Sequence, residues 1–210
     1  MTSDSHIVAS NSDIVFPPAA RRAQAERNSA RLYAKRIAEG FPDRISPELA
    51  GFIAGLDTAF LATVSGAGAP YIQHRGGPKG FIKVLDDRTL GFADYAGNRQ
   101  YITISNLAGN DRAFLFLLDF ANRQRIKVWG RARVVENDPK LMERLVEPGY
   151  RARPERAILF TIEAWDVNCS QHITERYTQA EVALAVAGMR DRIAFLEDEL
   201  RSVQATAATS

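Results

Sequence analysis

Cysteine and histidine, on which metal sites and many nucleophilic mechanisms depend, are scarce in this sequence. Cys169 is the only cysteine among 210 residues, and the histidines are His6, His74 and His172. A lone cysteine excludes a disulfide within the chain, which is typical of proteins of the reducing cytoplasm. No H-E-x-x-H motif and no paired-cysteine spacing occurs, so no metal site is predicted. Cys169 and His172, close together in "NCSQH", leave two interpretations open: a Cys/His nucleophile or metal-ligand pair, or a packed strand end.

Long apolar runs and a strong charge imbalance are also absent. No run approaches 18 apolar residues, so no membrane-spanning helix is predicted. The N-terminal "MTSDSHIVASNSDIVF" has no basic region followed by an apolar one, which argues against a secretory signal. The net charge of +2 gives no reason to expect a nucleic acid or a membrane surface as partner. We therefore expect one cytoplasmic globular domain, for which 46% hydrophobic and 25% charged residues are ordinary values.

Two helices are predicted before the first strand. Residues 1–16 are polar and aperiodic and are predicted to form a loose arm. The segment 17–40 follows as a surface helix, with prolines at its start and Gly40 at its end, and its basic residues favour a solvated face over an anionic partner. Ser46 as N-cap and Pro47 at the first position mark the second helix, whose apolar residues at i, i+3, i+4 and i+7 indicate one buried face.

From residue 58 the pattern changes to short strands separated by turn signals. Strands are predicted at 58–65, 71–75, 80–85, 90–95, 112–120, 125–137 and 157–169. Helices are predicted between them at 97–110 and 138–147. Six or seven short strands with few helices between them argue for an antiparallel barrel.

The C-terminal residues 178–210 have a different periodicity. Apolar residues recur there at alternating spacings of four and three, which is an a/d heptad pattern over about three heptads. These residues are Val182, Val186, Met189, Ile193, Leu196, Leu200 and Val203. The pattern predicts a helix that either packs on its own domain or pairs with another helix.

Two basic segments could supply the hydrogen-bond donors that a phosphate group needs. The first, "QHRGGPKGFIK", places Arg75, Lys79 and Lys83 around three glycines. The second, "GNRQ" (97–100), stands where a helix begins, and a helix N-terminus offers free N–H groups and a positive dipole end. Neither is a P-loop or a G-x-G-x-x-G motif. From pattern alone, both remain either phosphate sites or solvated strand ends.

The order and spacing of these segments resemble FMN-binding split-barrel proteins related to pyridoxamine 5′-phosphate oxidase. The resemblance covers roughly residues 46–176, through "FLATVSGAGAPYIQHRGGPKGFIKVLDDRTLGFADYAGNRQYI", "NRQRIKVWGRARVVE" and "AWDVNCSQHI". The sequence of these segments is similar to a branch of this family other than the vitamin B6 oxidase itself. It implies an α+β fold, mainly β with flanking helices, built as a six-stranded antiparallel split barrel. The barrel would span 46–177, between an N-terminal arm and surface helix (1–45) and a C-terminal helix (178–210).

The resemblance also implies a homodimer with two FMN molecules at the subunit interface. Lys83 matches a phosphate-binding lysine of the family, whereas Pro78 stands where the family has an arginine, for which Arg75 is the nearest substitute. "NRQ" matches the family's Ser-Arg-Lys turn, and "FADY" matches the family's strand beside the flavin. "RIKVWG" and "NCSQH" match segments that lie across the dimer boundary in the family. The cofactor-binding residues implied in this way are Arg75, Lys83, Asp94, Tyr95, Asn98, Arg99, Gln100, Arg125, Lys127, Gln171 and His172.

On this interpretation, Arg75 and Lys83 donate to the phosphate and the nearby glycines let the backbone approach the ligand. The flavin carries the redox chemistry, and no side chain is named as a general acid or base. The expected function is an FMN-dependent oxidoreductase of unknown substrate, reduced by a nicotinamide or another electron donor. Two alternatives stay open: a non-catalytic flavin-binding or carrier protein, and a haem-binding split-barrel protein with His74 or His172 as iron ligand.

Overall fold

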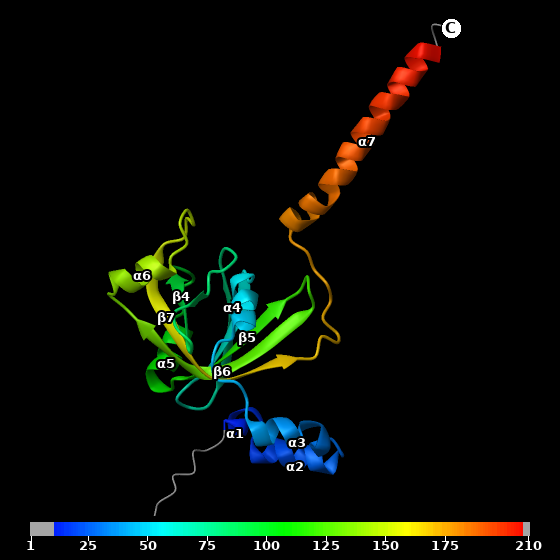
Figure 1. The fold of residues 1–210 in the computed structure, drawn as a ribbon. Helices are drawn as coiled ribbons and strands as arrows, with labels where there is room; N and C mark the ends of the chain where they lie inside the picture. Colours follow the sequence, from blue (N-terminus) through cyan, green and yellow to red (C-terminus); the bar gives the residue numbers. More distant parts are fainter. Residues whose placement is uncertain (1–10, 208–210) are drawn as a thin grey trace, which may run out of the picture. The chain divides into compact units, whose positions relative to one another are not determined.

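The computed structural model describes residues 11–207, which Figure 1 shows coloured along the chain. These residues divide into two compact units. The first contains the described residues up to Asp119 together with Gln124–Ser170, and it holds the whole sheet. The second contains Phe120–Arg123 and the described residues from Gln171 onward.

In the described residues four helices precede the first strand, and the first three are α1 (Ser12–Val15), α2 (Pro18–Glu26) and α3 (Ala30–Glu39). The single helix predicted over 17–40 is wrong, because Asn28 takes a left-handed φ of 58° and separates α2 from α3. The predicted loose arm is also wrong for residues 11–16, since Val15 packs in an apolar cluster with Phe41 and Ala164. Residues 1–10 lie outside the described residues. Gly40, with φ of 81°, ends α3 as predicted.

Helix α4 (Pro47–Ala54) begins where the sequence predicts. The hydroxyl of Ser46 accepts a hydrogen bond from the Leu49 N–H at 3.2 Å, and Pro47 occupies the first position. Leu49 and Ile53 are fully buried, which confirms the predicted apolar face. The cap therefore fixes where this helix begins, and the apolar spacing fixes which face packs against the core.

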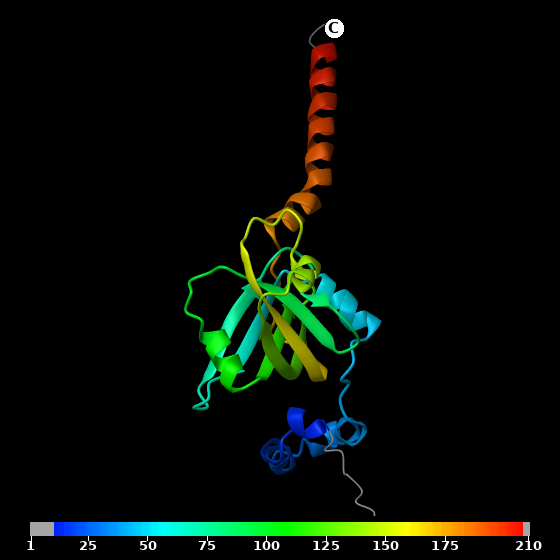
Figure 2. The same cartoon turned by 90° about the vertical axis from the view of Figure 1, so that its left-hand side faces the viewer.

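Seven antiparallel strands form one sheet in the order β2-β1-β5-β6-β7-β4-β3. The strands are β1 (Thr58–Val64), β2 (Pro70–Gly76), β3 (Lys83–Val84), β4 (Thr89–Tyr95), β5 (Arg112–Asp119), β6 (Gln124–Val135) and β7 (Pro154–Asn168). The family resemblance implies six strands, and this number is corrected to seven. The seven strands predicted from the residues are all present, although the one predicted over 80–85 is reduced to the two-residue edge strand β3 beside β4. Figure 2 shows the strands curling around a shared interior. The fold is α+β with a split-barrel-like antiparallel sheet, as predicted.

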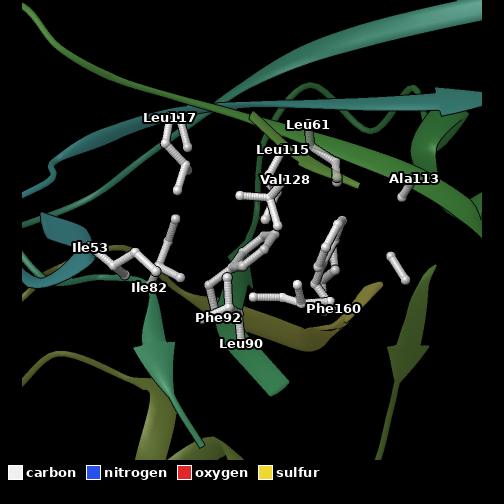
Figure 3. Close-up of a cluster of buried hydrophobic side chains, with 14 of the residues drawn as sticks. Ile53, Leu61, Ile82, Leu90, Phe92, Ala113, Leu115, Leu117, Val128 and Phe160 are labelled. Carbon is white, nitrogen blue, oxygen red and sulfur yellow. The ribbon is translucent and has the colours of Figure 1, made fainter. Parts of the chain in front are cut away.

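Apolar side chains from opposite parts of the sheet fill this interior, as Figure 3 shows. Buried and partly buried residues alternate along β1 and β5, so that Leu61 and Leu115 point inward. Phe92 of β4 and Phe160 of β7 fill the space opposite them, and Val128 of β6 lies between. Burying each such side chain contributes about 1.5–3 kcal/mol relative to exposure, so this cluster is the main stabilising element.

Strand β3 is much shorter than the strand predicted over 80–85. Phe81 and Ile82 are both buried, so the segment does not alternate as a strand would. Gly80 takes a φ of 79°, and a Cβ on Gly77 would lie 2.8 Å from the Cβ of Phe81. These glycines therefore close a tight turn against the protein itself, rather than opening the backbone to a ligand.

Three further helices complete the described structure: α5 (Ile102–Gly109), α6 (Pro139–Leu145) and α7 (Gln179–Ala207). Helix α6 begins at the predicted cap, where the carboxylate of Asp138 accepts a hydrogen bond from the Leu141 N–H at 3.0 Å. Helix α7 is one continuous helix of 29 residues, as the heptad pattern predicts. No helix of residues 11–207 is both long and apolar enough to span a lipid bilayer.

Candidate functional site

A cavity of about 220 Å³ lies at the amino end of α5. Side chains of β2, the end of β4 and the start of β7 form its walls, and the loop before α5 and the first turn of α5 complete it. The lining residues are Tyr71, Gln73, Arg75, Asp94, Tyr95, Gly97, Asn98, Arg99, Gln100, Tyr101, Ile102, Thr103, Ile104, Glu155 and Arg156. Most of these side chains are polar, so the cavity suits a polar or charged group.

Two side-chain hydrogen bonds, one buried and one partly buried, hold α5 in place beside this cavity. The hydroxyl of Thr103 donates to Oε1 of Gln73 on β2 at 2.8 Å, and the amide of Asn106 donates to the hydroxyl of Thr63 on β1 at 3.0 Å. Thr103 and Asn106 are 3% and 6% exposed, so both bonds are shielded from water. The amino end of α5, with its unpaired N–H groups and positive dipole end, is therefore fixed toward the cavity.

The loop before α5 has a constrained backbone. Arg99 and Tyr101 take left-handed φ values of 58° and 55°, and Asn98 Oδ1 accepts a hydrogen bond from the Gln100 N–H at 3.2 Å. The predicted helix over 97–110 therefore begins only after Tyr101. Left-handed backbone at non-glycine residues costs about 1–3 kcal/mol each and is frequent at ligand sites.

A buried triad of charged side chains forms another part of the cavity wall, where the Arg156 guanidinium lies 5.5 Å from the centroid of the Tyr101 ring in the loop. The Asp94 carboxylate pairs with Arg75 of β2 through Oδ1 and with Arg156 of β7 through Oδ2, the second at 3.3 Å. The side chains of Arg75, Asp94 and Arg156 are 14%, 8% and 13% exposed. Arg156 also pairs with Glu155 and Glu136, each at 3.2 Å. The triad therefore holds two guanidinium groups in fixed positions at the cavity.

Tyr95 ends β4 beside the triad, where a bulge shifts the pairing of β4 with β7. Its ring packs edge-on against Tyr150, with centroids 5.1 Å apart. Burial raises the pKa of the Tyr95 phenol, and the nearby Tyr150 and Glu147 raise it further, while a hydrogen bond from the Glu147 backbone acts in the opposite direction. Tyr95 is therefore a neutral phenol at physiological pH and can donate a hydrogen bond.

Residues 45–169 match the family model for pyridoxamine 5′-phosphate oxidase. The matched segment is more than half of the chain and includes every residue that lines the cavity. The chain belongs to the pyridoxamine 5′-phosphate oxidase family. A search of curated proteins found no match.

Several solved structures resemble this family member. HupZ from Group A Streptococcus is 16% identical, with 63% of this chain and 99% of that chain covered and a TM-score of 0.46. An FMN-binding protein from Syntrophomonas wolfei is 16% identical over 69% and 97% of the chains, with a TM-score of 0.46. The heme storage protein HutZ from Vibrio cholerae is 17% identical over 59% and 94%, with a TM-score of 0.40. Likenesses at this level do not assign a ligand to this chain.

The cavity brings together six of the residues that the family resemblance indicates: Arg75, Asp94, Tyr95, Asn98, Arg99 and Gln100. Lys83 is not among the lining residues, because its ammonium pairs with Glu147 outside the cavity. Arg125 and Lys127 lie on the outer face of β6, where Lys127 pairs with Asp166 at 3.3 Å. Gln171 and His172 are exposed and belong to the second unit.

Sequence reasoning missed Arg156, which is central to the site. Arg156 and Asp94 are 62 residues apart in sequence, and their contact arises from the pairing of β4 with β7. The start of β7 reads "PERAILF", so the one available signal was an arginine placed before a buried apolar run. Gln73 and Thr103, which fix α5, were missed for the same reason, because their contact also joins distant segments.

Proposed function

We propose that this chain binds FMN with its phosphate at the amino end of α5 and acts as an FMN-dependent oxidoreductase. The observation that carries the proposal is the convergence of Arg75, Arg99 and Arg156 on one cavity beside a fixed helix N-terminus. Helix N–H groups and guanidinium groups are the donors that bind phosphate best in proteins. Membership of the pyridoxamine 5′-phosphate oxidase family supports a flavin as the molecule that carries this phosphate.

The charges and donors of the cavity fit a phosphate group. Three arginines face two carboxylates, those of Asp94 and Glu155, so the lining keeps an excess of positive charge. The Nε of Arg75 is buried and has no hydrogen-bond partner among the described residues, so it is a donor in need of an acceptor. A phosphate monoester carries about −1.5 to −2 charges near pH 7 and offers three acceptor oxygens, which would satisfy both requirements.

Asp94 has a positioning role in this proposal. By pairing with Arg75 and Arg156 at once, its carboxylate keeps both guanidinium groups in place before the phosphate arrives. Such pre-organisation lowers the entropy that is lost on binding. Arg99, exposed on the loop before α5, supplies the third guanidinium.

The cavity of one chain is too small for a whole flavin nucleotide. Its volume is about 220 Å³, whereas complete ligand pockets measure about 300–1,000 Å³. We therefore propose a homodimer in which the partner chain completes each site around the flavin ring. The family resemblance indicates Arg125 and Lys127 of β6, with Gln171 and His172, as the contribution of that second chain.

The outer face of the sheet supports self-association. Phe60 lies opposite Phe116 and Ala62 lies opposite Phe114 in the pairing of β1 with β5, so four apolar side chains are adjacent on the face that does not point to the core. Ile72 of the neighbouring β2 is 61% exposed. An apolar patch of this kind is typical of a protein–protein interface.

Bound FMN supplies electron transfer between a donor and an acceptor, and the protein binds, orients and shields it. The purified protein is expected to be yellow and to release FMN on denaturation. A chromophore identified by chromatography as FAD or haem, or no chromophore after incubation with FMN, would contradict the proposal. Bleaching of the flavin absorbance by NADH or NADPH, followed by reoxidation with an acceptor, would support an oxidoreductase. A flavin that neither nicotinamide nor any other donor reduces would indicate a flavin carrier.

A further inference from the structure

Helix α7 carries a long apolar stripe that the other residues of its own unit leave exposed. The helix is 29 residues long, about 44 Å at 1.5 Å per residue. The stripe residues Met189, Ile193, Leu200 and Val203 are 66%, 56%, 57% and 65% exposed, and Leu196 is 45% exposed. An amphipathic helix of this kind gains its stability from burying such a stripe, so we expect these side chains to pack against another surface.

The stripe has the heptad order of a coiled coil. With Ile193 at position a, Val186 and Leu200 also take a positions, and Val182, Met189, Leu196 and Val203 take d positions. The residues that flank such a seam, at positions e and g, set the partner and the orientation. In α7 the charged flanking residues are Arg190 and Glu197 at e, and Arg192 and Glu199 at g.

These flanking charges are complementary to a second copy of α7 that runs in the opposite direction. If Val186 faces Val203 of the second copy, Ile193 faces Leu196 and the entire stripe is covered. In this alignment Arg190 lies beside Glu197 and Arg192 beside Glu199, and twofold symmetry produces each pair twice. The basic half of each seam then meets the acidic half of the other.

A parallel pair fits the same charges less well. In a parallel pair whose two helices are in register, each residue lies beside the same residue of the other helix. A g position of one helix then contacts the e position of the next heptad of the other helix, and the only ion pair formed in this way is Arg192 with Glu197. The acidic run Glu197, Asp198 and Glu199 of one chain would also lie beside the same run of the other. Like charges in this arrangement are unfavourable.

We propose that α7 is a self-association helix, which pairs with α7 of a second copy of this chain in an antiparallel two-stranded coiled coil. The proposal does not depend on the proposed function. It uses only residues of α7, which lies wholly within the second unit.

Disulfide trapping in the full chain tests the proposal. In a Cys169→Ser background, chains carrying Val186→Cys are co-expressed with chains carrying Val203→Cys, purified and oxidised. An antiparallel pair places these two positions opposite each other, whereas two copies of residue 186 are about 25 Å apart, which is far beyond the reach of a disulfide. We expect a cross-linked dimer from the mixture and none from either chain alone.

A matched control uses Asp191→Cys with Asp198→Cys. These residues lie at equal heights in the antiparallel pair but on the face away from the seam, so no cross-link is expected. Cross-links within each chain type alone would show a parallel pair, and no cross-link in the mixture would show that α7 does not self-associate. Either result overturns the proposal.

Charge reversal gives a second test of the orientation. The change Arg190→Glu places like charges at the Arg190–Glu197 contacts and should lower the cross-linking yield of the Val186→Cys and Val203→Cys mixture several-fold. Adding Glu197→Arg should restore the yield in an antiparallel pair. In a parallel pair the same double change would place Arg192 beside an arginine and give no recovery. Yields that do not change, or that are not restored, contradict the antiparallel arrangement.

Discussion

Replacing Asp94 by asparagine tests whether the buried charged triad is as tightly coupled as its geometry indicates. The substitution keeps the shape of the side chain and removes its charge. Arg156 keeps Glu136 and Glu155 as partners, whereas Asp94 is the only ion-pair partner of Arg75 among the described residues. Asp94→Asn therefore leaves chiefly the Arg75 guanidinium, 14% exposed, without a counter-charge.

The expected cost follows from this burial. Removing one partner of a buried ion pair costs about 3–5 kcal/mol, and the lower end applies because Arg156 keeps its other partners. A loss of about 3 kcal/mol is a large part of the total stability of about 5–15 kcal/mol that is usual for a domain. Urea unfolding at pH 7, followed by circular dichroism, measures it.

Two comparisons make the result interpretable. Asp13→Asn removes a partner from the Arg21–Asp13 pair, whose side chains are 36% and 54% exposed, and should cost less than about 1 kcal/mol. Arg75→Gln combined with Asp94→Asn should cost less than the sum of the two single changes, because no unpaired charge remains. If Asp94→Asn destabilises the protein no more than Asp13→Asn, the triad is not a buried, coupled unit.

Three further predictions concern the dimer, a titrating group and a close contact. A chain with Arg99→Ala mixed with a chain with Arg125→Ala should form dimers with one intact FMN site, and no recovery of FMN binding would show that each site belongs to one chain. Because burial raises the pKa of the Tyr95 phenol above the ordinary value of about 10, the stability it contributes is complete below about pH 10 and falls as the pH rises above that value. Absorbance titration at alkaline pH should show a phenol ionisation above pH 10 that Tyr95→Phe removes. Gly130→Ala should cost about 3 kcal/mol in urea unfolding, since its Cβ would lie 2.1 Å from the backbone carbonyl oxygen of Thr161 and 2.6 Å from the Phe160 ring, whereas Gly51→Ala, with no atom within 4 Å, should be tolerated.

The sequence predicts best those elements whose signals are local. Ser46 and Pro47 mark the start of α4 because a cap and a fixed proline φ act within one turn of helix. Short apolar runs next to turn signals also predict β1 and β5, and the structure then shows buried and partly buried residues alternating along both strands.

The errors arise where long-range contacts override local pattern. Phe81 and Ile82 read as part of a strand, but both enter the core from a turn. The start of α5 was predicted too early, because the left-handed Tyr101 gives no sequence signal. Asp94 and Arg156 meet only through the pairing of β4 with β7, so the triad could not be read from either segment alone.

The most direct test of the proposed site compares the affinities of FMN and riboflavin, which differ by the phosphate alone. Titrations that follow flavin fluorescence give both dissociation constants for the native chain, for Arg99→Ala and for Lys83→Ala. If the phosphate lies at the amino end of α5, Arg99→Ala should weaken FMN binding by about 1.5–3 kcal/mol, the value of a charge-assisted hydrogen bond, and leave riboflavin binding nearly unchanged. Lys83→Ala should have a smaller effect on FMN, because Lys83 pairs with Glu147 outside the cavity. Equal losses for FMN and riboflavin in Arg99→Ala, or a native chain that binds both flavins equally well, would contradict the proposed phosphate site.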